Sequence, residues 1–86
     1  MSTSPIEVRP LARTVVVTDA ELTVGLADGR VITVPLVWFP RLVRASAAAR
    51  ARWKLLGDGE GIHWPEADED LSVAGLLAGN RARGAA

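Results

Sequence analysis

His63 is the only histidine of the chain, and it lies seven residues before Asp70. Asp70 is the last of four closely spaced carboxylates. A histidine can act as a general acid or base where a partner orients it inside a cleft. His63 stands between Ile62 and Trp64, two residues typical of a buried strand, and this setting favours a structural role. The sequence therefore predicts no catalytic residue. A small hydrolase or metal-dependent enzyme that uses His63 with Asp68 or Asp70 is kept as an alternative hypothesis.

The carboxylates after His63 are oxygen ligands of the kind that hard cations prefer. They are Glu66, Asp68, Glu69 and Asp70. Their spacing lacks the Asp-x-Asp-x-Asp-Gly pattern of an EF-hand, so no metal site is predicted. No cofactor is predicted either, because the glycines at 57, 59 and 61 are not followed by the Lys-Ser or Lys-Thr pair of a phosphate-binding loop.

Three interpretations remain open for this acidic segment, residues 66–70. Its carboxylates can pair with Arg41, Arg44 or Arg50 of the same chain. They can favour the positive end of a helix that begins after Ser72. In the third interpretation they meet a basic patch on a partner protein and mainly raise the rate of association.

Aromatic residues directly precede two prolines, in Trp38-Phe39-Pro40-Arg41 and in His63-Trp64-Pro65. Tryptophan and arginine are frequent anchors of protein interfaces, but a domain this small needs most of its aromatic surface for the core. We expect the core to bury most of that surface, with part of Trp38 or Trp64 left exposed for a partner. The predicted partner-binding residues are Trp38, Arg41, Trp64, Glu66, Asp68, Glu69 and Asp70.

Length and charge restrict the function further. A chain of 86 residues is expected to form one domain. Ten basic and ten acidic residues give a net charge of zero, which argues against long-range attraction to nucleic acid or to an anionic membrane. A DNA-binding regulator is kept as a further alternative, and its candidate residues are Arg41, Arg44, Arg50 and Arg52. The lack of cysteine, of a signal peptide and of a long apolar run predicts a soluble cytoplasmic protein.

Two predicted strands, 14–18 and 21–26, lead into a hairpin at Asp28-Gly29, a pair typical of a two-residue turn. That turn would place Leu26 opposite Val31 and Leu22 opposite Pro35. Residues 1–13 are predicted to form an extended arm, 14–79 a single domain and 80–86 a flexible tail.

Pro40 suits the first position of a helix. The apolar spacing of three and four continues to Leu56, but Ser46 can cap a new helix and split the segment into a turn over 40–45 and a helix over 47–54. Residues 62–64 are predicted to be a short strand. Ser72 is predicted to cap a helix over 73–78 that ends at Gly79. The fold class is therefore α+β, a small antiparallel sheet built around a β-hairpin with two or three short helices packed on it.

The chain resembles the bacterial domain-of-unknown-function family 2442. The motifs that carry the resemblance are, in order, Leu22-x-Val24-x-Leu26-x-Asp28-Gly29-Arg30, Val34-Pro35-Leu36, Trp38-Phe39-Pro40-Arg41-Leu42, Gly57-x-Gly59-x-Gly61-Ile62-His63-Trp64-Pro65, Asp68-Glu69-Asp70-Leu71-Ser72-Val73 and Gly75-Leu76-Leu77. The resemblance implies a small α+β domain without an established active site. Some members are encoded beside another small uncharacterised protein, which suggests a toxin-antitoxin pair. Relatives often carry proline and acidic residues where this chain has Ala47-Ala48-Ala49.

Taken together, these patterns favour binding over catalysis. The predicted function is that of a protein-interaction module, in an antitoxin-like role beside a second small protein. Its partner would be a basic protein that meets the acidic segment, or another copy of the chain, rather than a membrane or a nucleic acid.

Overall fold

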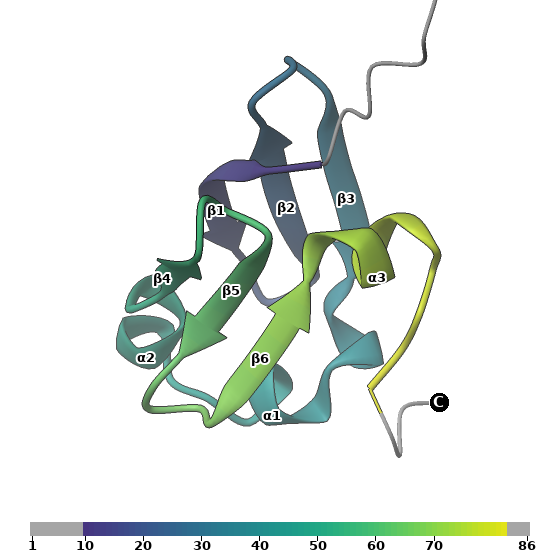
Figure 1. Ribbon diagram of the computed structural model, residues 1–86. Helices are drawn as coiled ribbons and strands as arrows, with labels where there is room; N and C mark the ends of the chain where they lie inside the picture. Colours follow the sequence, from purple (N-terminus) through teal and green to yellow (C-terminus); the bar gives the residue numbers. More distant parts are fainter. Residues whose placement is uncertain (1–9, 83–86) are drawn as a thin grey trace, which may run out of the picture.

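The computed structural model describes residues 10–82, which form two three-stranded antiparallel sheets and several short helices (Figure 1). The first sheet has the order β1-β2-β3, with strands Ala12–Val17, Glu21–Leu26 and Val31–Pro35. The second has the order β4-β5-β6, with strands Lys54–Leu56, Gly61–Trp64 and Glu69–Ser72. The helical elements are the 3-10 turn η1 (Leu36–Trp38), α1 (Pro40–Val43), α2 (Ala47–Ala51) and α3 (Val73–Leu77). The predicted α+β class with a β-hairpin is confirmed, and the strands are divided between two sheets instead of one.

Strand β1 begins at Ala12, two residues before the predicted strand. The predicted extended arm and flexible tail lie outside the described residues, except for residues 10–13 and 80–82. Residues 80–82 run beside η1, where the N–H of Ala82 donates to the carbonyl of Trp38 at 3.0 Å. No helix within residues 10–82 is long and apolar enough to cross a membrane.

The hairpin at Asp28-Gly29 is present, but its loop is longer than a two-residue turn. The N–H of Leu26 donates to the carbonyl of Arg30 at 2.8 Å, so residues 27–29 form the loop. Gly29 has a φ of 95°, in the left-handed region that glycine adopts without a steric penalty. This combination is typical of a type I turn followed by a bulge at the glycine.

The longer loop shifts the pairing of β2 with β3 by one residue from the predicted register. Leu22 lies opposite Val34, not opposite Pro35. Partners across an antiparallel pair share a face, so the shift puts Val34 on the core face together with Leu22. Thr23 and Thr33 share the other face, where their hydroxyls lie 3.2 Å apart. The predicted register was wrong because it assumed a turn without the bulge.

The Asp28 side chain holds the loop together. Its Oδ1 accepts from the backbone N–H of Arg30 at 3.0 Å, and its Oδ2 accepts from the Arg30 Nε at 2.7 Å. The backbone hydrogen bond is the main cause that lowers the pKa of the Asp28 carboxyl, and the guanidinium adds to it. Because the folded-state pKa is lowered, the hydrogen bonds to the Asp28 carboxylate add to the free energy of unfolding above the ordinary pKa of aspartate. This contribution is lost as the pH falls through the lowered pKa.

The helical segment after Pro40 is broken at Ser46, as predicted. Ser46 caps α2, and its Oγ accepts from the N–H of Ala49 at 3.0 Å. The predicted helix over 47–54 is too long, because α2 ends at Ala51 and residues 54–56 pair with β5 as strand β4. Leu56, the last residue of the apolar spacing that an unbroken helix would have buried, is 42% exposed.

Strand β5 forms the centre of the second sheet and ends before Pro65, which confirms the predicted strand. Strand β6 was not predicted, because it begins within the acidic segment and has no apolar alternation of its own. Ser72 caps α3 as predicted, with its Oγ accepting from the N–H of Gly75 at 2.9 Å. Gly79, with a φ of 79°, follows the end of that helix.

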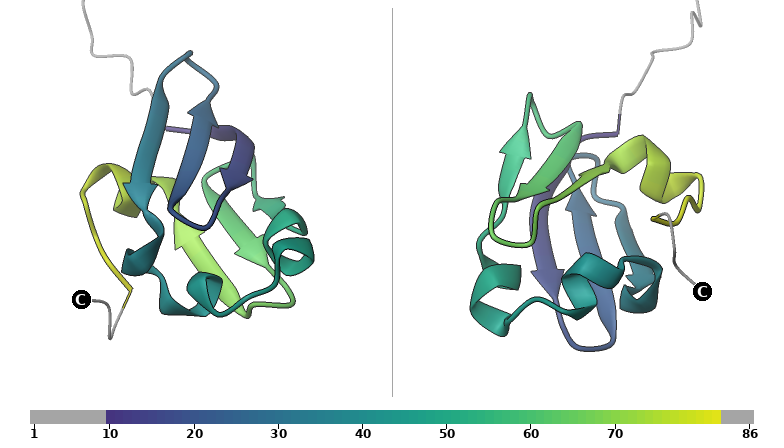
Figure 2. Two further views of the ribbon diagram at one scale, coloured as in Figure 1. Left: turned by 180° about the vertical axis from the view of Figure 1, so that it is seen from behind. Right: turned by 90° about the horizontal axis from the view of Figure 1, so that it is seen from below.

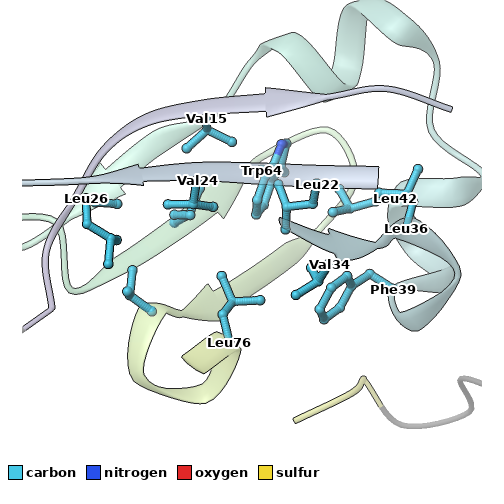
Figure 3. Close-up of a cluster of buried hydrophobic side chains, with 13 residues drawn as sticks. Val15, Leu22, Val24, Leu26, Val34, Leu36, Phe39, Leu42, Trp64 and Leu76 are labelled. Atoms are coloured by element: carbon cyan, nitrogen blue, oxygen red, sulfur yellow. The ribbon is translucent and has the colours of Figure 1, made fainter. Parts of the chain in front are cut away.

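The inward faces of the two sheets enclose one hydrophobic core (Figure 3). Leu22 and Val24 of the first sheet and Ile62 and Trp64 of the second are at most 1% exposed. Helices α1 and α2 lie at the lower end of the core in Figure 1, and α3 lies beside β3 (Figure 2). Burying these large side chains is the main stabilising term for a domain of this size.

The two sheets are joined at Gly59, in the turn between β4 and β5. The carbonyl of Gly59 accepts from the N–H of Ala12 at 2.7 Å, which ties the start of β1 to the second sheet. Gly59 has a φ of 111°, and a Cβ there would lie 2.5 Å from the Ala12 carbonyl oxygen. Only glycine therefore fits this joint without displacing β1.

We expect Gly59→Ala to lower the free energy of unfolding by about 1–3 kcal/mol, because it combines backbone strain with a clash against Ala12. Gly29→Ala is the matched control, since Gly29 also has a positive φ but a Cβ there would meet no atom within 4 Å. Urea unfolding followed by circular dichroism measures both variants. Equal losses in the two variants would contradict a tight joint at Gly59.

Candidate functional site: a groove rimmed by arginines

A groove of about 520 Å³ lies between α1, β6, α3 and the segment 80–82. Phe39 and Leu76, both labelled in Figure 3, supply apolar surface inside it and are 1% and 4% exposed. Its polar lining comes from Arg41, Arg44, Glu69, Asp70, Ser72, Asn80 and Arg81. The groove therefore joins an apolar floor to a rim that carries three arginines.

One wall of the groove is the segment 80–82, which two backbone hydrogen bonds fasten to the domain. The N–H of Asn80 donates to the carbonyl of Gly75 at 2.9 Å, and the N–H of Ala82 donates to the carbonyl of Trp38. The guanidinium of Arg81 lies over the Trp38 ring, 4.6 Å from its centroid. This cation–π contact covers part of Trp38, which is only half-buried.

Helix α1 places Arg41 and Arg44 on the opposite side of the groove. Pro40 occupies the first helical turn, and Arg44 is the residue at the C-terminal cap. Nη1 of Arg41 donates to the carbonyl of Asp68 at 2.6 Å. The side chain of Arg44 forms no hydrogen bond or ion pair with the residues described, 10–82. A second hollow of about 410 Å³ is also lined by these two arginines and includes Glu66.

Two carboxylates of the acidic segment are paired with arginines of the same chain. Oε2 of Glu66 lies 2.6 Å from Nη1 of Arg52, and Oδ2 of Asp68 lies 3.8 Å from Nη1 of Arg41. Asp68 has a φ of 52°, so the backbone turns sharply at this residue. Of the three interpretations of the acidic segment, pairing within the chain accounts for these two residues.

The other two carboxylates also have partners. Glu69 points toward the interior and is 8% exposed, and its Oε1 accepts from the N–H of Asp70 at 3.0 Å. Asp70 lies on the outward face of β6, where its Oδ1 forms a hydrogen bond with Nδ1 of His63. The acidic segment is consequently not a surface of unpaired negative charge.

His63 lies on the outward face of β5, between Lys54 on β4 and Asp70 on β6. An aspartate that hydrogen-bonds Nδ1 is an arrangement that orients a histidine for acid–base chemistry. Such chemistry also needs a concave site for the substrate, and His63 lines neither of the two hollows described above. Within residues 10–82, no group of three His, Asp or Glu side chains is placed to hold a metal ion.

Besides Glu69, two residues of the predicted binding sets belong to the interior. Trp64 is fully buried, and its indole N–H donates to the carbonyl of Arg50 at 3.0 Å, so Trp64 is corrected from a partner-binding residue to a core residue. Arg50 is 8% exposed and donates to the carbonyls of Leu42 and Val43 at the end of α1. The arginines of the DNA-binding hypothesis thus do not form one exposed basic face.

The structure brings five of the predicted binding residues to the corner between α1 and β6. They are Arg41, Glu66, Asp68, Glu69 and Asp70. The sequence set missed Arg44, although its spacing of three from Arg41 indicated a shared helical face. It also missed Asn80 and Arg81, which no sequence pattern indicated because they belong to the segment expected to be a flexible tail.

Residues 12–82, which include all six strands and the whole groove, match the family model described as a protein of unknown function (DUF2442). The chain belongs to this family. The resemblance seen in the order of its motifs is thereby confirmed. No curated protein matches the chain significantly.

Solved structures similar to this DUF2442 domain come from two bacteria. A protein of unknown function from Rhodospirillum rubrum ATCC 11170 has a TM-score of 0.73 and 31% sequence identity, over 87% of this chain and 93% of that chain. The uncharacterised protein CV0863 from Chromobacterium violaceum, solved by NMR in solution, has a TM-score of 0.71 and 21% identity, over 86% of this chain and 70% of that chain. The second likeness concerns the fold alone.

Proposed function

We propose that this DUF2442 domain is a protein-interaction module and that the arginine-rimmed groove is its binding surface. The observation that carries the proposal is the groove itself, where the apolar side chains of Phe39 and Leu76 lie beside the arginines of α1. A volume of about 520 Å³ is in the range of ligand-binding clefts, which combine apolar walls with a few polar groups. Arginine and aromatic residues are also enriched at protein interfaces.

A second small protein, bound in an antitoxin-like manner, is the partner that the family resemblance suggests. We place this interaction in the cytoplasm, the setting expected from the sequence. Another copy of the chain is the alternative partner, and a net charge of zero does not oppose self-association. In both cases the groove supplies recognition rather than chemistry, since Asp70 lines it but His63 does not.

The test is recovery of partners by the full-length tagged chain from its native cell extract. We expect Arg44→Glu to reduce recovery of a stoichiometric partner at least about tenfold, because it reverses a charge on the groove rim. Lys54→Glu is the matched control, since it makes the same change of charge on the outward face of β4, away from the groove. A partner retained equally by both variants, or recovery of no partner at all, would contradict the proposal.

A further inference from the structure

The two hollows beside α1 share Arg41 and Arg44, which stand between them as a cationic ridge. We infer that this surface takes an extended acidic segment of a partner protein. Carboxylates of that segment lie on the two ridge arginines, and an apolar side chain lies on the floor formed by Phe39 and Leu76. This inference rests on the proposed function and adds to it the chemistry of the partner.

The balance of charge in the groove supports an acidic occupant. The two carboxylates that line it are already engaged: Asp70 is bonded to His63 on the outward face of the sheet, and Glu69 is buried and bonded to a backbone N–H. On the rim, the guanidinium of Arg44 has no hydrogen-bonding or ionic partner within residues 10–82. An arginine binds a carboxylate through two parallel N–H donors, so a carboxylate is the group that Arg44 is suited to bind.

Arg41 can take part without giving up its structural contact. One terminal nitrogen donates to the Asp68 carbonyl, and the guanidinium has further N–H donors. Its ion pair with Asp68 spans 3.8 Å between side chains that are 57% and 93% exposed, so it is weak and exchangeable. A carboxylate from a partner can replace it at little cost.

The shape of the surface favours a chain segment over a small anion. A small anion would engage the arginines and leave the rest of the groove without a binding partner. The hollows measure about 520 and 410 Å³ and meet along the ridge, which suits side chains placed on either side of an extended backbone. The expected charge of the partner is thus opposite to that predicted from the acidic segment, because Glu66, Glu69 and Asp70 are engaged within the chain and only Asp68 is loosely paired.

The test is selection of random peptides displayed on phage against the immobilised full-length chain. We expect the selected peptides to carry Asp or Glu beside a large apolar residue. A synthetic copy of the strongest binder should lose at least about tenfold in affinity toward Arg44→Glu and show unchanged affinity toward Lys54→Glu. Exchanging one acidic residue of that peptide for Lys should restore part of its affinity for Arg44→Glu, which a merely unfolded variant would not do.

The outcomes separate the inference from the proposed function. In one outcome, the selected peptides are neutral or basic and still lose affinity toward Arg44→Glu. That result would overturn the inference that the partner's segment is acidic and would leave the groove as the binding surface. Selection of no peptide, or of peptides indifferent to Arg44→Glu, would overturn both.

Discussion

Replacing Trp64 with alanine is expected to remove a large part of the domain's free energy of unfolding. Trp64 has no exposed surface and lies on the central strand of the second sheet, facing the core. Truncating a buried tryptophan to alanine costs about 3–5 kcal/mol, and small domains have about 5–15 kcal/mol of total stability. The indole also donates to the carbonyl of Arg50, which the truncation leaves unpaired in the interior.

Urea unfolding followed by circular dichroism measures this loss, with two controls. Trp64→Phe keeps an aromatic ring but not the N–H donor, so we expect a smaller loss of about 1–3 kcal/mol. Val16→Ala truncates a side chain that is 57% exposed, and a change within about 0.5 kcal/mol is expected. If Trp64→Ala behaved like Val16→Ala, the placement of Trp64 in the core would be wrong.

The second large effect is expected for Arg50→Met, which keeps a long apolar side chain but removes the guanidinium. Nε of Arg50 donates to the carbonyl of Leu42 at 2.8 Å, and Nη2 donates to the carbonyl of Val43 at 2.9 Å. Both carbonyls belong to the last turn of α1. The Leu42 carbonyl also accepts from the N–H of Ala45 at 3.2 Å, so it keeps one donor without Arg50. Losing the bond to Leu42 and leaving the Val43 carbonyl without its guanidinium donor should lower the free energy of unfolding by about 2–4 kcal/mol, measured by urea unfolding.

Asp19→Ala is the matched control for Arg50→Met. Nη1 of Arg50 lies 2.6 Å from Oδ1 of Asp19, but the Asp19 side chain is 99% exposed while that of Arg50 is 9% exposed. Water screens the Asp19 carboxylate, so its removal should not change stability measurably. A loss from Asp19→Ala as large as that from Arg50→Met would show that the ion pair, and not the bonds to α1, makes Arg50 stabilising.

The elements predicted from the sequence are those with a local physical cause. Ser46 and Ser72 each cap a helix by accepting from the N–H three residues later, a contact that needs no other part of the chain. The break between α1 and α2, the strand before Pro65 and the hairpin at Asp28-Gly29 follow from equally short-range preferences. The α+β class and the family could be recognised for this reason.

Other elements depend on partners distant in the sequence. Residues 54–56 continue the apolar spacing of a helix, and they form β4 because β5 lies alongside them. Strand β6 is likewise formed by pairing with β5, although Glu69 and Asp70 have low strand propensity. The register of the hairpin depends on a single bulge at Gly29. Short-range preferences alone did not distinguish this bulged loop from a two-residue turn.

The candidate site was predicted only in part, for the same reason. The residue types indicated that Arg41 and the acidic segment could bind a partner. They could not show which carboxylates pair with arginines of the same chain. They also could not show that Arg50 bonds to α1 or that Arg81 lies over Trp38. Each of these contacts joins residues from different elements.

The sequence by itself determined the class of fold, the helix caps, the place of the hairpin and the membership of the DUF2442 family. Those features follow from turn chemistry, capping and apolar spacing, which act over a few residues. The tertiary structure decided that Trp64 and Arg50 are buried, that the acidic segment is paired, and that an arginine-rimmed groove lies between α1, β6 and α3. These properties depend on which surfaces meet when the two sheets close on each other, and burial and charge pairing between distant residues exist only after that closure.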